Sequence, residues 1–228
     1  MTFNVLFFDL DDTLYAKSNG LWEAIRKRMG EYLHERLGFS RESIPELRRN
    51  YFEKYGTTLR GLQIHHQVDA NEYLAYVHDL PLEKFLQPDP ALRNLITSLP
   101  QPKWIFTNAG DQHALRVLTS LGIKDCFQGI IDVRAMQFHC KPEIEAYKLA
   151  MKIAGVSNPE HCLYLDDSLR NLAPARELGL TTIWVGGKDQ NPAANYSISS
   201  LSELPGVLPQ LWPNGKVSIK MERNHGYQ

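Results

Sequence analysis

The sequence of 228 residues has few cysteines and no long apolar run. Its three cysteines, Cys126, Cys140 and Cys162, are odd in number and lack the spacing of a metal site. No apolar stretch approaches the roughly 20 residues that a membrane-spanning helix needs. The N-terminus has no basic region ahead of its short apolar run, so it does not resemble a signal peptide. We therefore expect reduced thiols, a cytoplasmic location and no membrane partner.

An excess of either charge is also missing, because 25 basic and 26 acidic side chains leave a net charge of −1. Binding of a nucleic acid polymer would favour a basic stripe, and the sequence has none. The length suits one domain with a full core, or one domain that carries an insertion. The hydrophobic fraction of 43% is ordinary for a globular protein. Composition therefore leaves the function to the motifs.

The first motif is an apolar run that ends in carboxylates. Residues 5–14 read Val-Leu-Phe-Phe-Asp-Leu-Asp-Asp-Thr-Leu, with the acids Asp9 and Asp11 at the end of a predicted buried strand. Side chains at i and i+2 on extended backbone point the same way, so both carboxylates face one space. Two acids held together need a counter-ion or an unequal sharing of protons. The pattern therefore indicates chemistry at a strand end.

Residues 15–87 are helical in character and differ from the segments on both sides. We expect three helices there, which begin near Leu21, after Ser43 and after Asp69. Asp69 followed by Glu72 resembles a capping box. Because the first strand belongs with strands beyond residue 100, we interpret 15–87 as an inserted helical cap over the strand ends. Linkers near 14–18 and 86–88 would let it close over a substrate.

Beyond residue 100, strands alternate with helices of 10 to 15 residues. This alternation predicts an α/β fold with a parallel sheet and right-handed crossovers. We expect residues 1–14 and 88–212 to form this α/β core and 213–228 to form a polar C-terminal tail.

Three of the later segments also end in polar side chains. These are Thr107 and Asn108, then Lys141 at the predicted start of a helix, and then the pair Asp166 and Asp167. The carboxyl ends of parallel strands share one edge of the sheet, where ligands of open α/β folds bind. We therefore expect these groups to meet Asp9 and Asp11 at one point.

This set of groups suits a phosphate monoester. Catalysis on a phosphoryl group consists largely of positioning and charge neutralisation, to which the Lys141 ammonium and the Thr107 hydroxyl would contribute. Several carboxylates in one place repel one another without a cation. Mg²⁺ prefers about six oxygen ligands and keeps some waters, so it fits such a cluster.

In order and spacing, these motifs resemble the haloacid dehalogenase superfamily of phosphatases, over residues 3–186. The resemblance implies a Rossmann-like, three-layer core and an aspartyl-phosphate formed on Asp9. It implies that Asp11 acts as general acid to the leaving alcohol and then as base to water. Thr107, Asn108 and Lys141 would bind the phosphate.

The resemblance also implies a magnesium site made of Asp9, the Asp11 carbonyl and the pair Asp166 and Asp167, with Asp167 favoured for direct ligation. Carboxylate chemistry agrees with covalent catalysis, because two easier steps replace one difficult hydrolysis. We expect Asp9 beside the metal to stay ionised and Asp11, off the metal and near a second anion, to be able to hold a proton.

Within 15–87, the stretches Tyr51-Phe-Glu-Lys-Tyr55-Gly56 and Arg60-Gly61-Leu62 resemble the cap of the pyrimidine 5′-nucleotidase group. This resemblance implies that the substrates are pyrimidine nucleoside monophosphates. Arginine forks and aromatic rings suit a base or a ribose. The candidate specificity residues are Arg60, Tyr55 and Arg49.

Two alternatives keep the same scaffold: a phosphatase for another small molecule, such as a sugar or organic acid phosphate, and a sugar phosphomutase. A receiver-like phospho-acceptor module is disfavoured because its acidic pair precedes the phosphorylated aspartate, whereas the pair here comes last. A dehalogenase is disfavoured because it has no leaving alcohol to protonate and so no need of Asp11. The sequence is compatible with a monomer or a homodimer.

Overall fold

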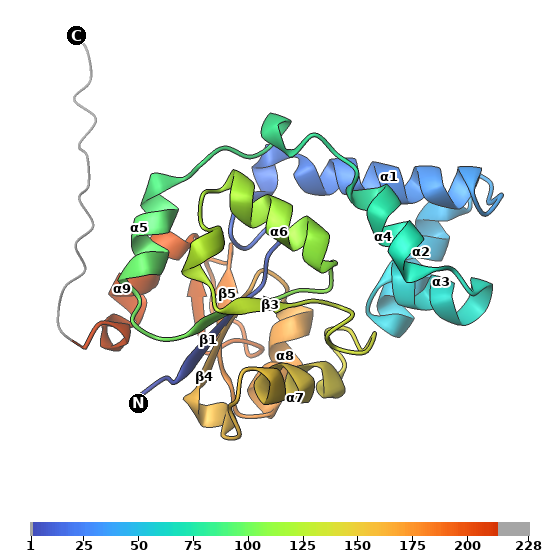
Figure 1. The fold of residues 1–228 in the computed structure, drawn as a ribbon. Coiled ribbons are helices and arrows are strands. Elements are labelled where there is room, and N and C mark those ends of the chain that lie inside the picture. Colours follow the sequence, from blue (N-terminus) through green and yellow to red (C-terminus); the bar gives the residue numbers. More distant parts are fainter. Residues whose placement is uncertain (1, 214–228) are drawn as a thin grey trace, which may run out of the picture.

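A six-stranded parallel sheet lies at the centre of the computed structural model, which describes residues 2–213 (Figure 1). The strands are β1 (Val5–Phe8), β2 (Lys103–Phe106), β3 (Gly129–Ile131), β4 (Cys162–Asp166), β5 (Thr181–Val185) and β6 (Tyr196–Ile198). Their order is β3-β2-β1-β4-β5-β6, and all pairs are parallel. The first strand therefore lies between β2 and β4, far away in sequence. This topology confirms the predicted Rossmann-like α/β fold.

Helices cover both faces of the sheet, and a further group forms a cap beside its upper edge in Figure 1. The helices are α1 (Leu21–Glu35), α2 (Ile44–Tyr55), α3 (Thr58–His66), α4 (Ala70–His78), α5 (Pro90–Ser98), α6 (Asp111–Ser120), α7 (Ile144–Ile153), α8 (Leu169–Glu177) and α9 (Leu204–Val207). No helix within residues 2–213 has both the length and the apolar character that crossing a membrane would demand. Apart from Pro213, the predicted tail at 213–228 lies outside the described residues.

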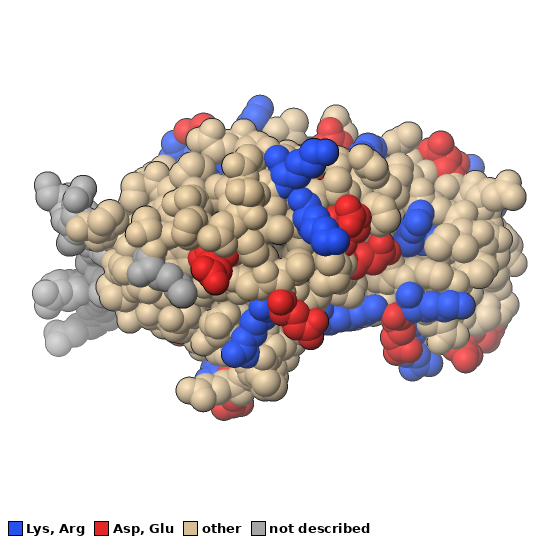
Figure 2. Space-filling model, turned by 90° about the horizontal axis from the view of Figure 1, so that it is seen from below, with Lys and Arg blue, Asp and Glu red and all other residues tan. Residues whose placement is uncertain are grey.

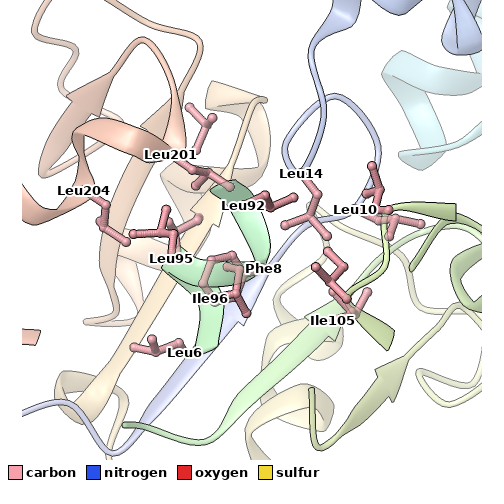
Figure 3. Close-up of a cluster of buried hydrophobic side chains, with 14 of the residues drawn as sticks. Leu6, Phe8, Leu10, Leu14, Leu92, Leu95, Ile96, Ile105, Leu201 and Leu204 are labelled. Atoms are coloured by element: carbon pink, nitrogen blue, oxygen red, sulfur yellow. The ribbon is translucent and has the colours of Figure 1, made fainter. Parts of the chain in front are cut away.

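The side chains of β1 alternate between two apolar layers. Leu6 and Phe8 pack with α5, α6 and α9, as the close-up in Figure 3 shows for the α5 side. Val5 and Phe7 pack on the opposite face with α7 and α8. All four side chains are buried, as expected for a parallel strand covered on both faces. The strand is thus anchored on both sides just before Asp9.

The inserted helices α1 to α4 have an apolar core of their own. It contains Tyr32, Leu62, Tyr73 and Val77, and Val133 from the loop after β3 joins it. The predicted helix starts are confirmed, and Asp69 Oδ1 accepts hydrogen bonds from the backbone N–H groups of residues 71 and 72 at 2.8 and 2.9 Å. The cap therefore packs on itself and on one core loop.

The structure adds elements that the sequence analysis missed. Helix α3 has nine residues, and a short helix is marginal without packing partners, so its periodic signal is weak. Its cap is Thr57, whose Oγ1 accepts from Arg60 N at 3.0 Å. Strand β6 has three residues and lies at the sheet edge. Helix α7 begins at Ile144, so Lys141 lies in a turn ahead of it and not at its first position.

The face shown in Figure 2 carries acidic and basic side chains of both signs without a large patch of either. Such interspersed charge is what a near-zero net charge produces on a globular surface.

The cap touches the core near Lys141 through the C-terminal end of α2. Arg170 of α8 donates to the carbonyls of Phe52 and Glu53 at 2.5 and 2.7 Å. The Cys140 thiol donates to the Tyr55 carbonyl at 3.1 Å. These contacts join the cap to the strand-end loops that hold the polar groups.

Gly56 tests how tightly this junction is packed. A Cβ there would lie 2.9 Å from both Cys140 Sγ and the Lys141 carbonyl, and its φ is +85°. We expect Gly56→Ala to lower the free energy of unfolding by about 1 to 2 kcal/mol of backbone strain, plus about 1 to 3 kcal/mol from overpacking. Urea unfolding measures both.

The matched control is Gly38→Ala, because Gly38 has φ +74° but nothing within 4 Å of the position that an added methyl group would take. Gly38→Ala should lower the free energy of unfolding by the backbone strain alone. Equal losses for the two variants would contradict the close packing at Gly56.

Candidate active site

The polar strand ends meet at a cavity of about 710 Å³ between the sheet and the cap. Strand β1 pairs in parallel register with both neighbours, Phe8 lying opposite Ile105 and Leu165. The groups that follow these strands therefore share one edge. The sequence-predicted residues that line the cavity are Asp9, Asp11, Arg49, Thr107, Asn108, Lys141 and Asp167.

Lys141 lies at the centre of the polar groups with 1% of its surface exposed. Its ammonium donates to Asp9 Oδ1 at 2.6 Å, to the Phe106 carbonyl at 2.8 Å and to Asp166 Oδ2 at 3.0 Å. Burial lowers the pKa of Lys141, but Asp166 and Asp9 raise it above its ordinary value on balance. The side chain is therefore a fixed positive charge between two carboxylates.

Asn108 holds the backbone of Lys141. Its Nδ2 donates to the Lys141 carbonyl at 2.9 Å, and its Oδ1 accepts from Lys141 N at 2.8 Å. Both ends of the amide thus contact the Lys141 backbone, and the second hydrogen of Nδ2 and the backbone N–H are left for a phosphate oxygen. Thr107 Oγ1 accepts from Ala109 N at 3.0 Å. Its hydroxyl hydrogen has no acceptor within residues 2–213 and can be donated to a phosphate oxygen.

Three carboxylates form a cluster in which oxygens of Asp9, Asp166 and Asp167 lie within 4.8 Å of one another. Asp166 is fully buried, and its oxygens accept from Lys141, Tyr164, Asn171 and the Ser168 N–H. Asp167 lines the cavity, and Lys17 Nζ lies 2.7 Å from its Oδ2. These contacts favour Asp9 and Asp167 as ligands and leave Asp166 to orient Lys141.

The charges of the cluster fit a divalent cation. Burial raises the pKa of Asp9 well above its ordinary value; Lys141 opposes this rise, and Asp166 and Asp167 add to it. Burial and Asp166 also raise the pKa of Asp167, against the effect of Lys17. A cation would relieve this repulsion, and oxygen ligands suit Mg²⁺. The residues present therefore fit the metal that the sequence predicts.

Asp11 has partners that the sequence analysis missed. Its Oδ1 accepts from the Tyr15 hydroxyl at 2.6 Å and lies 2.9 Å from His113 Nε2. Burial raises the pKa of Asp11, but His113 and Tyr15 outweigh it and lower the pKa to about 2. These two donors hold Asp11 as an anion, because hydrogen bonds to the charged form favour it. The proton expected on Asp11 beside a second anion stays a prediction.

Only one of the three predicted specificity residues of the cap lines the cavity. Arg49 lines the cavity, whereas Tyr55 and Arg60 do not. The Tyr55 hydroxyl lies 2.5 Å from His65 Nε2 on the α2–α3 surface. Tyr55 ends α2 and Arg60 lies in α3; residues 56–59 between them line the cavity, but these two side chains do not. Further residues that line the cap side include Trp22, Arg48 and Tyr73.

The family model described as haloacid dehalogenase-like hydrolase matches residues 3–179. The chain belongs to this family. Phosphate metabolism protein 8 of Saccharomyces cerevisiae is 32% identical over 190 residues, which are 77% of this chain and 59% of the yeast protein. The hydrolase thus spans less than two thirds of that relative's length.

Two further comparisons agree. Glyceraldehyde 3-phosphate phosphatase of Methanocaldococcus jannaschii is 24% identical over 234 residues, 90% of this chain and 97% of that protein. The magnesium-bound structure of the HAD-hydrolase YfnB from Bacillus subtilis matches with a TM-score of 0.61 at 19% identity, covering 91% of this chain and 99% of that chain. At this identity the match shows the fold alone.

The importance of the Lys141 charge can be tested by stability. Lys141→Met leaves Asp9 and Asp166 without their shared cation, and breaking a buried ion pair costs about 3 to 5 kcal/mol. We expect a loss of this size in urea unfolding at neutral pH with a chelator present.

Lys103→Met is the matched control, since Lys103 is also buried but bonds only to the carbonyls of Leu99 and Gln101. Its loss should be smaller, about 1 to 3 kcal/mol for unpaired acceptors. Equal losses would show that Lys141 does not balance the carboxylates.

Proposed function

We propose that this hydrolase is a Mg²⁺-dependent phosphomonoesterase that works through an aspartyl-phosphate. One observation carries the proposal: Asp9, Asp11, Thr107 and Lys141 line a single cavity, with the acidic cluster beside Asp9. This geometry supplies a nucleophile, a proton carrier, a hydroxyl donor and a fixed positive charge around one phosphoryl group.

In the first step, an Asp9 carboxylate oxygen attacks phosphorus while the bond to the leaving oxygen breaks and Asp11 gives that oxygen its proton. In the second step, Asp11 takes a proton from water and the water oxygen attacks phosphorus. The bond between Asp9 and phosphorus breaks, which frees the Asp9 carboxylate and inorganic phosphate. Lys141 and Thr107 stabilise the charge on the phosphoryl oxygens in both steps. Mg²⁺ held by Asp9, Asp167 and the Asp11 carbonyl would neutralise charge between the phosphoryl group and the carboxylates.

The proton on Asp11 must accompany the substrate, because the pKa of Asp11 is about 2. A phosphate dianion beside Asp11 raises this pKa, since a like charge disfavours the ionised form. A monoanionic ester also carries a proton of its own into the site. With a dianionic ester, Asp11 takes from solvent the one proton that the leaving alcohol needs; with a monoanionic ester, the substrate brings it.

For the substrate, we propose pyrimidine nucleoside 5′-monophosphates, on the resemblance of the cap to that nucleotidase group. The cavity volume of about 710 Å³ is within the range of small-molecule sites. Trp22, Phe52 and Tyr73 offer flat apolar surfaces, and Arg48 and Arg49 offer donors for base or ribose oxygens. A small sugar phosphate is the second candidate, because the relative from Methanocaldococcus jannaschii is named for glyceraldehyde 3-phosphate.

A phosphate-release panel tests reaction and substrate together. We expect Mg²⁺-dependent release from UMP and CMP to exceed that from AMP, GMP and sugar phosphates, and EDTA to abolish it reversibly.

Asp9→Asn should lower kcat by at least about a thousandfold, because loss of a covalent nucleophile removes the main pathway. Arg49→Ala should raise KM for UMP, and Arg60→Ala, outside the cavity, is its matched control.

The outcomes separate the parts of the proposal. Release from sugar phosphates but not from nucleotides would overturn the substrate class alone. An isomerised product without free phosphate would indicate a phosphomutase. Full activity of Asp9→Asn would overturn the mechanism.

A further inference from the structure

The second feature of the site is a pair of histidines behind Asp11. His113 of α6 is buried, with 2% of its surface exposed, and its Nε2 contacts Asp11 Oδ1. The Tyr15 hydroxyl donates to the same oxygen. Asp11 Oδ2 has no hydrogen bond to any described residue. Two donors therefore fix one oxygen of the carboxylate and leave the other for a leaving group in the cavity.

His113 itself is held from the cap side. The ring of His78, at the end of α4, stacks on the His113 ring with centroids 4.0 Å apart and an interplanar angle of 17°. Both rings are buried. His113 Nδ1 has no hydrogen-bond partner within residues 2–213, so the ring is located by Asp11 on one nitrogen and by the stack on its face.

Helix α6 also fixes the backbone of His78. Arg116 donates to the His78 carbonyl at 2.8 Å and to the Leu80 carbonyl at 2.5 Å. His113 and Arg116 are three positions apart, so they lie on the same face of α6. One helix face therefore holds the end of the cap by a ring stack and by two hydrogen bonds, directly behind Asp11.

The stacked rings of His78 and His113 need not carry two positive charges. Burial and His113 lower the pKa of His78 to about 3, so His78 is neutral at neutral pH. A neutral ring can lie flat on a hydrogen-bonded imidazole without placing two positive charges in contact. His78 thus contributes a flat surface.

We propose that His113 is a positioning residue that orients Asp11 for proton transfer, and that His78 couples this orientation to docking of the cap. The inference rests on the proposed function in taking Asp11 as the proton donor. As the P–O bond breaks and the Asp9–P bond forms, the proton passes from Asp11 Oδ2 to the leaving oxygen. With the cap undocked, His113 loses the stack and Asp11 loses its fixed orientation.

Leaving-group dependence tests this role. We would measure kcat/KM, which reports the first chemical step, for p-nitrophenyl phosphate and phenyl phosphate with Mg²⁺. Nitrophenolate leaves readily without a proton, whereas phenolate needs one. We expect His113→Ala to lower the phenyl to p-nitrophenyl ratio of kcat/KM at least about tenfold, as part of the 10²- to 10⁴-fold contribution of proton transfer. The ratio is independent of the folded fraction.

Three further variants define the role. His113→Gln, which keeps an N–H donor, should restore part of the ratio. His78→Ala should lower the ratio more than His78→Phe, which keeps a flat ring. In the Asp11→Asn background, His113→Ala should lower the ratio no further, because residues that act as a unit are not additive.

Gln112→Ala is the matched control on the same helix, since Gln112 is exposed and its side chain makes no hydrogen bond within the described residues. It should keep the wild-type ratio. An unchanged ratio in His113→Ala would overturn the inference, and equal effects of His78→Ala and His78→Phe would overturn the part played by the stack. If the wild-type protein released phosphate from neither these esters nor the nucleotides of the panel, the proposed function itself would fail.

Discussion

The charge on Lys141 is the constraint on which the site depends. Its ammonium is buried between Asp9 and Asp166, and the acids of the cluster could not be gathered in a low-dielectric interior without a compensating cation. Several elements serve this one contact. Strand order brings β1 beside β2 and β4, the Asn108 amide fixes the Lys141 backbone, and Tyr164 and Asn171 orient Asp166. A divalent ion held by the acidic cluster would complete the neutralisation that Lys141 begins.

The cap contributes to the site on two sides. At the end of α2, Arg170 and Cys140 tie it to the loop that carries Lys141. At the end of α4, His78 and Arg116 tie it to the helix behind Asp11. The cap therefore contacts the core both at the loop of Lys141 and at the helix behind Asp11, and its residues form one wall of the cavity. These contacts between particular residues of this chain join the cap to the core of the family fold.

The sequence predicted the core well because its signals are local. Three of these signals depend only on neighbours within a few residues: the buried run that ends in Asp9, the strand that ends at Asp166 and the N-cap of α4 at Asp69. It predicted the strand-end groups because parallel strands bring their carboxyl ends together.

What the sequence could not predict depends on contacts between distant segments. Tyr15 and His113 are single residues on a linker and a helix, and no spacing shows that both meet Asp11. The sequence analysis therefore did not include the two contacts that lower the pKa of Asp11. Tyr55 and Arg60 lie in stretches that resemble a family cap, but only residues 56–59 between them line the cavity, and the short helix α3 has too brief a periodicity to detect.

The most direct test is to trap the intermediate with Asp11→Asn and p-nitrophenyl phosphate. This ester needs no proton to leave, so Asp9 should still be phosphorylated, while the water step lacks its base and stalls. The account predicts a burst of nitrophenolate that approaches one equivalent per enzyme, and a phosphate mass on the peptide that contains Asp9 after acid quench. Nitrophenolate release that matches the wild-type rate, or a phosphate on any residue other than Asp9, would contradict it.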